Sequence, residues 1–318
     1  MTNRTDDLIL AGLDGSNPLA FLAALGTLRT LSLAWPGQRV KMRWVQHAGA
    51  WRPAVRSEVL ESEDSLTLAI DQQLQRVMVN PALQFADNLN VSAEVFRSFA
   101  TGLMEQAHAS PDAAERLGAD FASAFACDAL VNEQLKVQDT ALRTMSGAGH
   151  QHFIASMRFI VENTHAEHIR KALFRPWRYD DPIAKQSLRW DPFEDNRYAL
   201  QWRDPSGDPA RNQRGTMLGA NRLAIEGIPL LTCAPEGKSL RTVGFKGRGR
   251  LDTYWTWPVW DAPISLDVCR GLLASASFPD VVPDALSAFK SMGIRCLFRS
   301  QRITTGKFRN FTPAVAVF

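Results

Sequence analysis

The hydrophobic residues near the start of this chain recur with the period of a helix. Between residues 18 and 35, leucine and alanine return every three to four positions, which predicts a helix with a wide apolar face. Ser16 or Asn17 can cap this helix, and Pro18 suits its first turn, where the N–H that proline lacks would have no intrahelical partner. We therefore expect a buried helix that directly follows a turn.

A strand is predicted on each side of that helix. Leu8 to Ala11 is a short apolar run, and in the following segment the apolar Val40, Met42 and Trp44 alternate with Lys41, Arg43 and Val45, as in a strand with one buried face. A β-α-β opening of this kind fits half of a ferredoxin-like or RNA-recognition-motif-like fold.

The middle of the chain keeps the helical spacing of apolar residues. The pattern predicts one long helix from His152 to Leu173 and a helix start at Ser110 to Asp112. After residue 174, frequent prolines and tryptophans indicate irregular chain with one strand at Arg197 to Trp202, and strand-rich chain follows.

These patterns together predict an α+β fold with ferredoxin-like or RNA-recognition-motif-like β-α-β elements. Residues 1–56 and 174–318 are expected to form a nucleic-acid-binding core, and residues 57–173 a mostly helical insertion or subdomain.

Charge is distributed unevenly over these segments. The formal net charge of +3 is too small to identify a nucleic-acid partner. The segment from Val55 to Val137, however, contains thirteen Asp and Glu but only five Lys and Arg. The segment from Lys238 to Asn310 contains twelve basic residues but only five acidic ones. A basic last third beside an acidic middle suggests that one surface of the protein binds a polyanion and that the acidic surface points away from it.

Cysteine usage and hydropathy restrict the compartment. The four cysteines are far apart and form no CxxC pair, and no signal peptide is evident, so we expect reduced thiols in a cytoplasmic protein. No run of eighteen apolar residues occurs, and no membrane partner is therefore expected.

A basic and aromatic segment between Arg241 and Trp260 gives the first functional signal. Glycines alternate with its cations, and four aromatic residues follow within ten positions. Cations for phosphates beside rings that stack on bases are what a surface for single-stranded nucleic acid needs. The residues of this segment that we predict to bind nucleic acid are Lys246, Arg248, Arg250 and Trp255.

A second segment near the C-terminus repeats this chemistry. The predicted binding residues there are Arg299, Arg302, Lys307, Phe308 and Arg309. In both segments the cations would neutralise phosphates, while Trp255 and Phe308 would stack on bases. The alternative is a hairpin tip leading into a strand whose aromatic side chains fill the core, since tryptophans are highly buried on average. We expect Trp257 and Trp260 to pack in this way around Pro258.

Other candidate chemistry is weaker, and neither a metal nor another cofactor is predicted. His165 and His168 are spaced to chelate a metal on a helix, but the known zinc signatures are absent and a solvated helix face explains them better. The glycine-rich Ser146 to His150 segment lacks the Lys-Ser/Thr pair of a phosphate-binding loop, and a turn between helices is the better explanation. No catalytic motif was found, so no catalytic residue is assigned.

An acidic cluster lies in a tryptophan-rich stretch. Asp191, Glu194 and Asp195 could hold a divalent cation, but Arg189 and Arg197 flank them, and internal ion pairing is the preferred interpretation.

Five blocks of the sequence resemble proteins encoded in type I-U (also called I-G) CRISPR loci. They are LAGLDGSNPLAFLAALGTLRTL, RWDPFEDNRYALQW, GANRLAIEGIPLL, WTWPVWDAPISLDVCRGLL and GKFRNFTPA, spread over nearly the whole chain. The resemblance implies a role in prokaryotic antiviral defence, in or beside an RNA-guided effector complex whose other subunits would be partners. It carries no catalytic residue onto this sequence.

Three functions follow as hypotheses. The first is a non-catalytic protein of the interference complex that binds guide RNA, target DNA or both. The second is a metal-independent endoribonuclease that processes guide precursors, with His47, His150 or His152 as general acid or base. The third is a protein-interaction subunit whose acidic helical middle recruits the effector nuclease.

Overall fold

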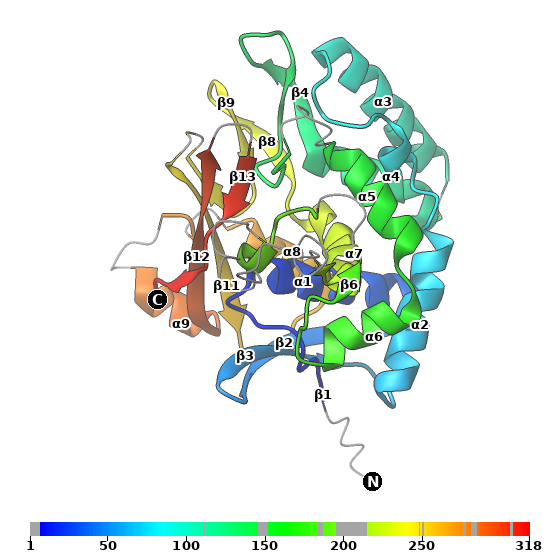
Figure 1. Ribbon diagram of the computed structural model, residues 1–318, viewed down its shortest axis with the longest axis vertical. Helices are drawn as coiled ribbons and strands as arrows, with labels where there is room; N and C mark the ends of the chain where they lie inside the picture. Colours follow the sequence, from blue (N-terminus) through cyan, green and yellow to red (C-terminus); the bar gives the residue numbers. More distant parts are fainter. Residues whose placement is uncertain are drawn as a thin grey trace, which may run out of the picture.

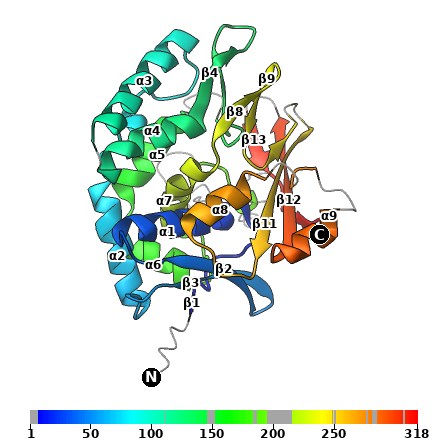
Figure 2. The ribbon, with the colours of Figure 1, turned by 180° about the vertical axis from the view of Figure 1, so that it is seen from behind.

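An α+β architecture is present in the computed structural model, with a helical side and a sheet side around a central helix pair (Figure 1). The same layers are seen from behind in Figure 2. The structure describes residues 7–110, 112–145, 152–182, 187–194, 215–247, 249, 251–275, 278–280, 285–305 and 308–318.

The predicted apolar helix is confirmed as α1 (Pro18–Ala34). The side chain of Asn17 caps it by accepting a hydrogen bond from the Ala20 amide at 3.1 Å. The first fourteen residues of α1 are all buried, which explains why its apolar residues occupy more than one face.

Helix α1 crosses α7 (Leu218–Gly227) at very short range, and this contact forms the centre of the molecule. A Cβ atom at Gly26 would lie 1.7 Å from the carbonyl oxygen of Leu223, so only glycine permits the approach. Beside this contact, Glu226 of α7 accepts hydrogen bonds from Arg29 at 2.9 Å and from Arg222 at 2.5 Å. All three of these charged residues are buried.

The N-terminal strands form a three-stranded antiparallel sheet. It contains β1 (Leu8–Ile9), β2 (Lys41–His47) and β3 (Ala50–Arg56) in the order β1-β3-β2. Because α1 connects β1 to β2, this is the arrangement expected for the first half of a ferredoxin-like fold. Within the described residues this sheet has no fourth strand on the other side of β1.

The middle segment is helical, as predicted, but it also contains a β-hairpin. Its helices are α2 (Glu63–Arg76), the 3₁₀-helix η1 (Pro81–Gln84), α3 (Ala93–Ala109), α4 (Ala113–Phe125), α5 (Phe153–Asn163) and α6 (Ala166–Phe174). The hairpin consists of β4 (Ala126–Val131) and β5 (Val137–Asp139). Buried residues of this segment and of the rest of the chain belong to one continuous hydrophobic cluster.

The prediction of one long helix from His152 to Leu173 was wrong. The helix breaks between α5 and α6 at Thr164, which has an extended backbone. The Thr164 hydroxyl donates to the Ile160 carbonyl, and the His165 amide donates to Nδ1 of His168 at 3.1 Å. These side chains hydrogen-bond to a backbone carbonyl and a backbone amide that would otherwise pair with each other's neighbours in a continuous helix.

The C-terminal part contains short two-stranded ladders and a five-stranded sheet. One ladder pairs β6 (Asp181–Pro182) with β7 (Gly215–Thr216), and the other pairs β8 (Cys233–Glu236) with β9 (Ser239–Thr242). Two 3₁₀-helices of this part are η2 (Pro192–Glu194) and η4 (Ile228–Leu230). The larger sheet contains β10 (Phe245–Lys246), β11 (Thr253–Trp260), β12 (Ile294–Thr305), β13 (Phe308–Phe311) and β14 (Val315–Ala316), with helices α8 (Leu266–Leu273) and α9 (Ala285–Ser291) between β11 and β12.

Tryptophans of β11 connect this sheet to the N-terminal unit. The indole of Trp257 donates to the Gly15 carbonyl at 2.8 Å, and that of Trp260 donates to the Met42 carbonyl at 3.0 Å. Both side chains are buried, which confirms the prediction that they pack in the core.

Replacing Gly26 by alanine should destabilise the protein by about 3 kcal/mol or more, because the new methyl group would overlap the backbone of α7. Chemical denaturation measures this. Gly102→Ala in α3 is the matched control, since open space surrounds that position and alanine should stabilise the helix there by about 0.5–1 kcal/mol. A Gly26→Ala protein as stable as the wild type would contradict the close crossing.

Candidate functional site

The aromatic side chain predicted to stack on a base in the first basic segment is instead part of the core. Trp255 is 0% exposed, and its ring stacks on Phe245 with centroids 5.5 Å apart. Trp257 and Phe311 also contact it. The prediction that Trp255 is available to a base was wrong, because alternation along β11 turns this residue toward the core.

Three predicted cations of the second segment take part in tertiary contacts. Arg299 donates to the Thr256 hydroxyl and to the Pro279 carbonyl, each at 2.9 Å. Arg302 is buried and donates to the Ala141 carbonyl at 2.7 Å. Arg309 donates to the Arg143 carbonyl at 3.2 Å, and burial lowers its pKa below the ordinary value. These guanidinium groups join the C-terminal sheet to other parts of the fold.

Along the chain, the remaining predicted residues flank or fall in two loops, β10–β11 and β12–β13, with Lys246 the last residue of β10 and Phe308 the first residue of β13. Lys246 is 62% exposed and forms an ion pair with Asp280. Arg248, Arg250 and Lys307 lie outside the described residues, as does the side chain of Phe308. Because Thr253 pairs with Arg302, the strand ends that lead into both loops lie at the same end of the sheet.

A basic face that sequence reasoning missed lies on the β2–β3 hairpin. The strand register places Lys41 opposite Arg56, Arg43 opposite Ala54 and Val45 opposite Arg52. Because side chains alternate between faces, all four cations share the face opposite to buried Met42 and Trp44.

In the described part of the chain, the carboxylate of Asp7 lies among these four cations. Asp7 accepts from Nε of Arg43 at 2.5 Å and from Nε of Arg56 at 2.6 Å, yet these two side chains remain 36% and 40% exposed. Within the described part of the chain, neither Lys41 nor Arg52 has a carboxylate within salt-bridge distance, and Nε of Arg52 is buried without a hydrogen-bond partner. The face therefore keeps an excess of positive charge.

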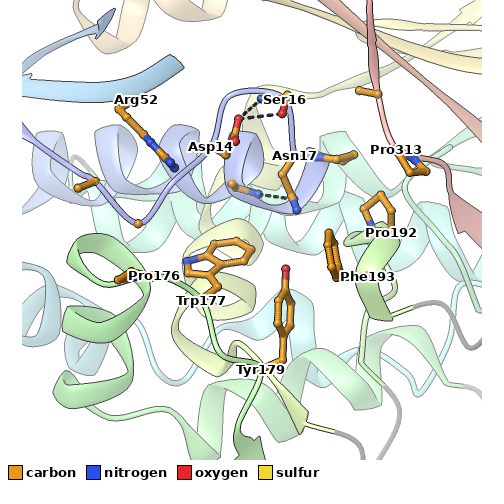
Figure 3. Close-up of a pocket in the computed structure, with 15 residues that line it drawn as sticks. Asp14, Ser16, Asn17, Arg52, Pro176, Trp177, Tyr179, Pro192, Phe193 and Pro313 are labelled. Atoms are coloured by element: carbon orange, nitrogen blue, oxygen red, sulfur yellow. Dashed lines mark hydrogen bonds between the residues drawn. The ribbon is translucent and has the colours of Figure 1, made fainter. Parts of the chain in front are cut away.

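Arg52 also lines a pocket of about 400 Å³. Figure 3 shows the turn before α1 on one side of the pocket, with aromatic residues on the other. Pro313 and Ala314 of the C-terminal segment complete the wall. The polar and aromatic residues that line it are Asp14, Ser16, Asn17, Arg52, Trp177, Tyr179 and Phe193.

The aromatic rings of the pocket form a short stack. The Tyr179 ring lies 5.6 Å from that of Phe193 and nearly parallel to it, and its edge meets Trp177 at 6.0 Å. Phe193 is 48% exposed. Tyr179 has φ of 54°, a left-handed conformation that is costly for an aromatic residue. Gly215 accommodates its backbone, since a Cβ there would lie 1.6 Å from the Tyr179 carbonyl oxygen.

A buried carboxylate holds these walls together. Asp191 accepts from the Tyr179 hydroxyl and from the Phe193 amide, each at 2.9 Å, and also from the side chain of Asn17. Burial raises the pKa of Asp191, and burial together with the Asp191 charge raises the pKa of Tyr179, which therefore remains a protonated donor.

Glu194 lies behind this layer and interacts with neutral groups. It accepts from the Thr216 hydroxyl, which in turn accepts from the Asn221 side chain at 3.1 Å. Burial and the nearby charge of Asp191 raise the pKa of Glu194 to about 7. Asp195 and Arg197, which the predicted ion pairing also involved, lie outside the described residues.

The histidine candidates do not gather at this pocket. His47 is exposed at the tip of the β2–β3 hairpin, and His152 precedes α5. His165 is the N-cap residue of α6 and its amide donates to the His168 side chain, whereas His150 lies outside the described residues. In the part of the chain that is described, no group of three or more His, Cys, Asp or Glu is arranged to hold a metal.

The sequence contains the turns that form this pocket, but their local patterns do not show that they lie together in the fold. From the sequence, the residues before Pro18 indicate only a turn and a helix start, and the frequent prolines and tryptophans after residue 174 indicate only irregular chain. Bringing these turns together requires the packing of α1 against α7.

Three of the five sequence blocks quoted above contribute residues to the lining of the pocket, and the other two contribute residues that contact its surroundings. Residues of the first, second and fifth blocks line it. The third supplies Asn221 near Glu194, and the fourth supplies Trp257, which holds the Gly15 carbonyl.

Comparison with known proteins adds no family assignment, since no family model and no curated protein matches the chain. Among the described residues, no helix has both the length and the apolar character needed to cross a bilayer.

The raised pKa of Glu194 makes stability depend on pH. Between its ordinary value of 4.5 and about 7, the folded protein keeps a proton that the unfolded chain has lost, so stability should fall as pH rises through this range. Glu194→Gln should reduce the loss in unfolding free energy between pH 5 and pH 8 by roughly 1–3 kcal/mol. Glu105→Gln, at an exposed position of α3, should behave like the wild type. Parallel curves for wild type and Glu194→Gln would show that Glu194 is already ionised at pH 5.

Proposed function

We propose that this chain is a non-catalytic protein that binds single-stranded nucleic acid, guide RNA or target DNA, in a CRISPR interference complex. The observation that carries the binding part is the β2–β3 face, where four cations lie together and, among the described residues, only Arg43 and Arg56 are paired, both with Asp7. An excess of positive charge that is ordered on a sheet attracts a phosphate backbone without reading its sequence.

The layout of this face suits an extended strand of phosphates. Its cations lie in two neighbouring rows, with Lys41 and Arg43 on β2 and Arg52 and Arg56 on β3. Lys41 and Arg52 are available for phosphates, and Arg43 and Arg56 can reach them with the guanidinium nitrogens that Asp7 does not engage. The exposed Lys246, at the loop end of the other sheet, is a second contact in this proposal.

The place of the protein in a CRISPR complex rests on the sequence resemblance. Such complexes hold a guide RNA and pair it with target DNA, and their proteins mostly contact the backbone. A protein that binds the nucleic-acid backbone through a basic sheet face is consistent with this mode of recognition. Other effector subunits are the proposed protein partners, and co-purification with them tests this part.

Removing cations from the β2–β3 face should weaken binding and reduce its dependence on salt. For single strands, log K should fall with log salt by about 0.7 for each phosphate contact, so Lys41→Gln with Arg52→Gln should lower that slope by about 1.4. Fluorescence anisotropy with labelled single-stranded RNA and DNA measures both quantities.

The matched control for this experiment replaces two exposed lysines elsewhere in the protein. Lys238→Gln with Lys290→Gln changes the net charge equally at positions away from the face, and should leave the slope nearly unchanged. No binding at low salt, or binding that does not respond to salt, would contradict the proposed function.

One observation favours the endoribonuclease as a second candidate. His47 is exposed and follows Lys41, Arg43 and Val45 on the same face of β2, so an imidazole lies at the end of the basic rows. A metal-independent nuclease needs such a general acid or base beside bound RNA.

Incubation with a CRISPR repeat RNA in the presence of a chelator separates the two candidates. The proposed binding function predicts intact RNA, for wild type and for His47→Ala alike. Cleavage by the wild type that His47→Ala abolishes would replace the binding function with the enzymatic one.

A further inference from the structure

We propose that the pocket beside Arg52 takes one unpaired nucleobase that carries an exocyclic amino group, from a strand whose phosphates lie on the β2–β3 face. This inference rests on the proposed function and adds a specificity site to it. A pocket of about 400 Å³ lies within the roughly 300–1,000 Å³ range of small-molecule sites.

The aromatic wall provides the stacking surface. Phe193 is the partly exposed end of the stack that continues through Tyr179, and Trp177 lies at the edge of Tyr179. Bases stack on such rings whatever their sequence. The Asp191 hydrogen bonds hold Tyr179 and the Phe193 backbone in place, so this platform is formed before a ligand arrives.

Arg52 links the pocket to the phosphate-binding face. It belongs to the rows of cations on β3 and also lines the pocket, with a buried Nε that lacks a hydrogen-bond partner within the described residues. An arginine at this boundary can hold the phosphate next to the inserted base. A free nucleotide and a nucleotide within a strand would use the same contacts.

Asp14 provides the preference among bases. Its Oδ1 accepts from the Ser16 amide at 2.9 Å and from the Ser16 hydroxyl at 2.8 Å, and these bonds leave Oδ2 for a ligand. A carboxylate oxygen accepts from the amino group of adenine, cytosine or guanine. Uracil has no amino group and offers only its N3–H, which lies between two carbonyl oxygens that repel a carboxylate. Strands of adenine or cytosine should therefore bind more tightly than strands of uracil.

The experiment compares oligo(A), oligo(C) and oligo(U) RNA of equal length by fluorescence anisotropy, with heparin as a polyanion that has no bases. Phe193→Ala should weaken binding of oligo(A) roughly tenfold and leave heparin binding unchanged. Met104→Ala, at an exposed position of α3, is the matched control and should change neither.

Asp14→Asn tests recognition apart from folding. Asparagine keeps the Oδ1 acceptor for Ser16 but replaces Oδ2 by a donor, so the preference should shift from oligo(A) and oligo(C) toward oligo(U). A variant that merely unfolds would lose all strands together, and circular dichroism would detect this.

The outcomes separate the two proposals. If wild type binds heparin and RNA but Phe193→Ala binds oligo(A) as tightly as the wild type, the base pocket is wrong and the basic face stands. An oligo(U) affinity equal to that for oligo(A), unchanged in Asp14→Asn, would also overturn the pocket. If wild type binds neither RNA nor heparin, the proposed function itself fails.

Discussion

The contact between α1 and α7 fixes the relative positions of almost every element around the pocket. At Gly26 the two helix backbones approach to a distance that no side chain permits, and beside it Glu226 is held between two buried arginines. A buried charge of this kind is tolerated only while its partners stay in place. The two helices can therefore cross at only one pair of positions. This crossing places the turn before α1 opposite the segment before α7.

The candidate site is a consequence of that register. The turn before α1 supplies Asp14 and Asn17, while the chain before α7 supplies Tyr179 and Asp191. Asp191 then joins both sides through hydrogen bonds to neutral donors. Burying the carboxylate of Asp191 costs free energy, and Tyr179 adds backbone strain. Such costs are typically retained where a site needs a fixed geometry.

The basic residues illustrate why composition locates a surface poorly. Twelve cations in the last third of the chain suggested a binding face there, yet Arg299, Arg302 and Arg309 hold parts of the fold together through backbone carbonyls. The β2–β3 hairpin has fewer cations, but its alternation places them all on one face, where Asp7 pairs with two of them. Side-chain direction and pairing decide whether a charge is available, and neither is visible in a count.

Local signals in the sequence by themselves determined the first helix, with Ser16 or Asn17 as its cap, the strand at β2 and the α+β class, since period and capping act over a few residues, and the structure selects Asn17 as the cap. The break at Thr164 was decided by nearby side chains that compete for backbone hydrogen bonds, whereas the burial of Trp255 and the pocket were decided by the tertiary structure. Each of these depends on groups that are far apart in the chain or on side chains that compete for backbone hydrogen bonds. Only packing brings Asp14, Arg52 and Phe193 to one cavity.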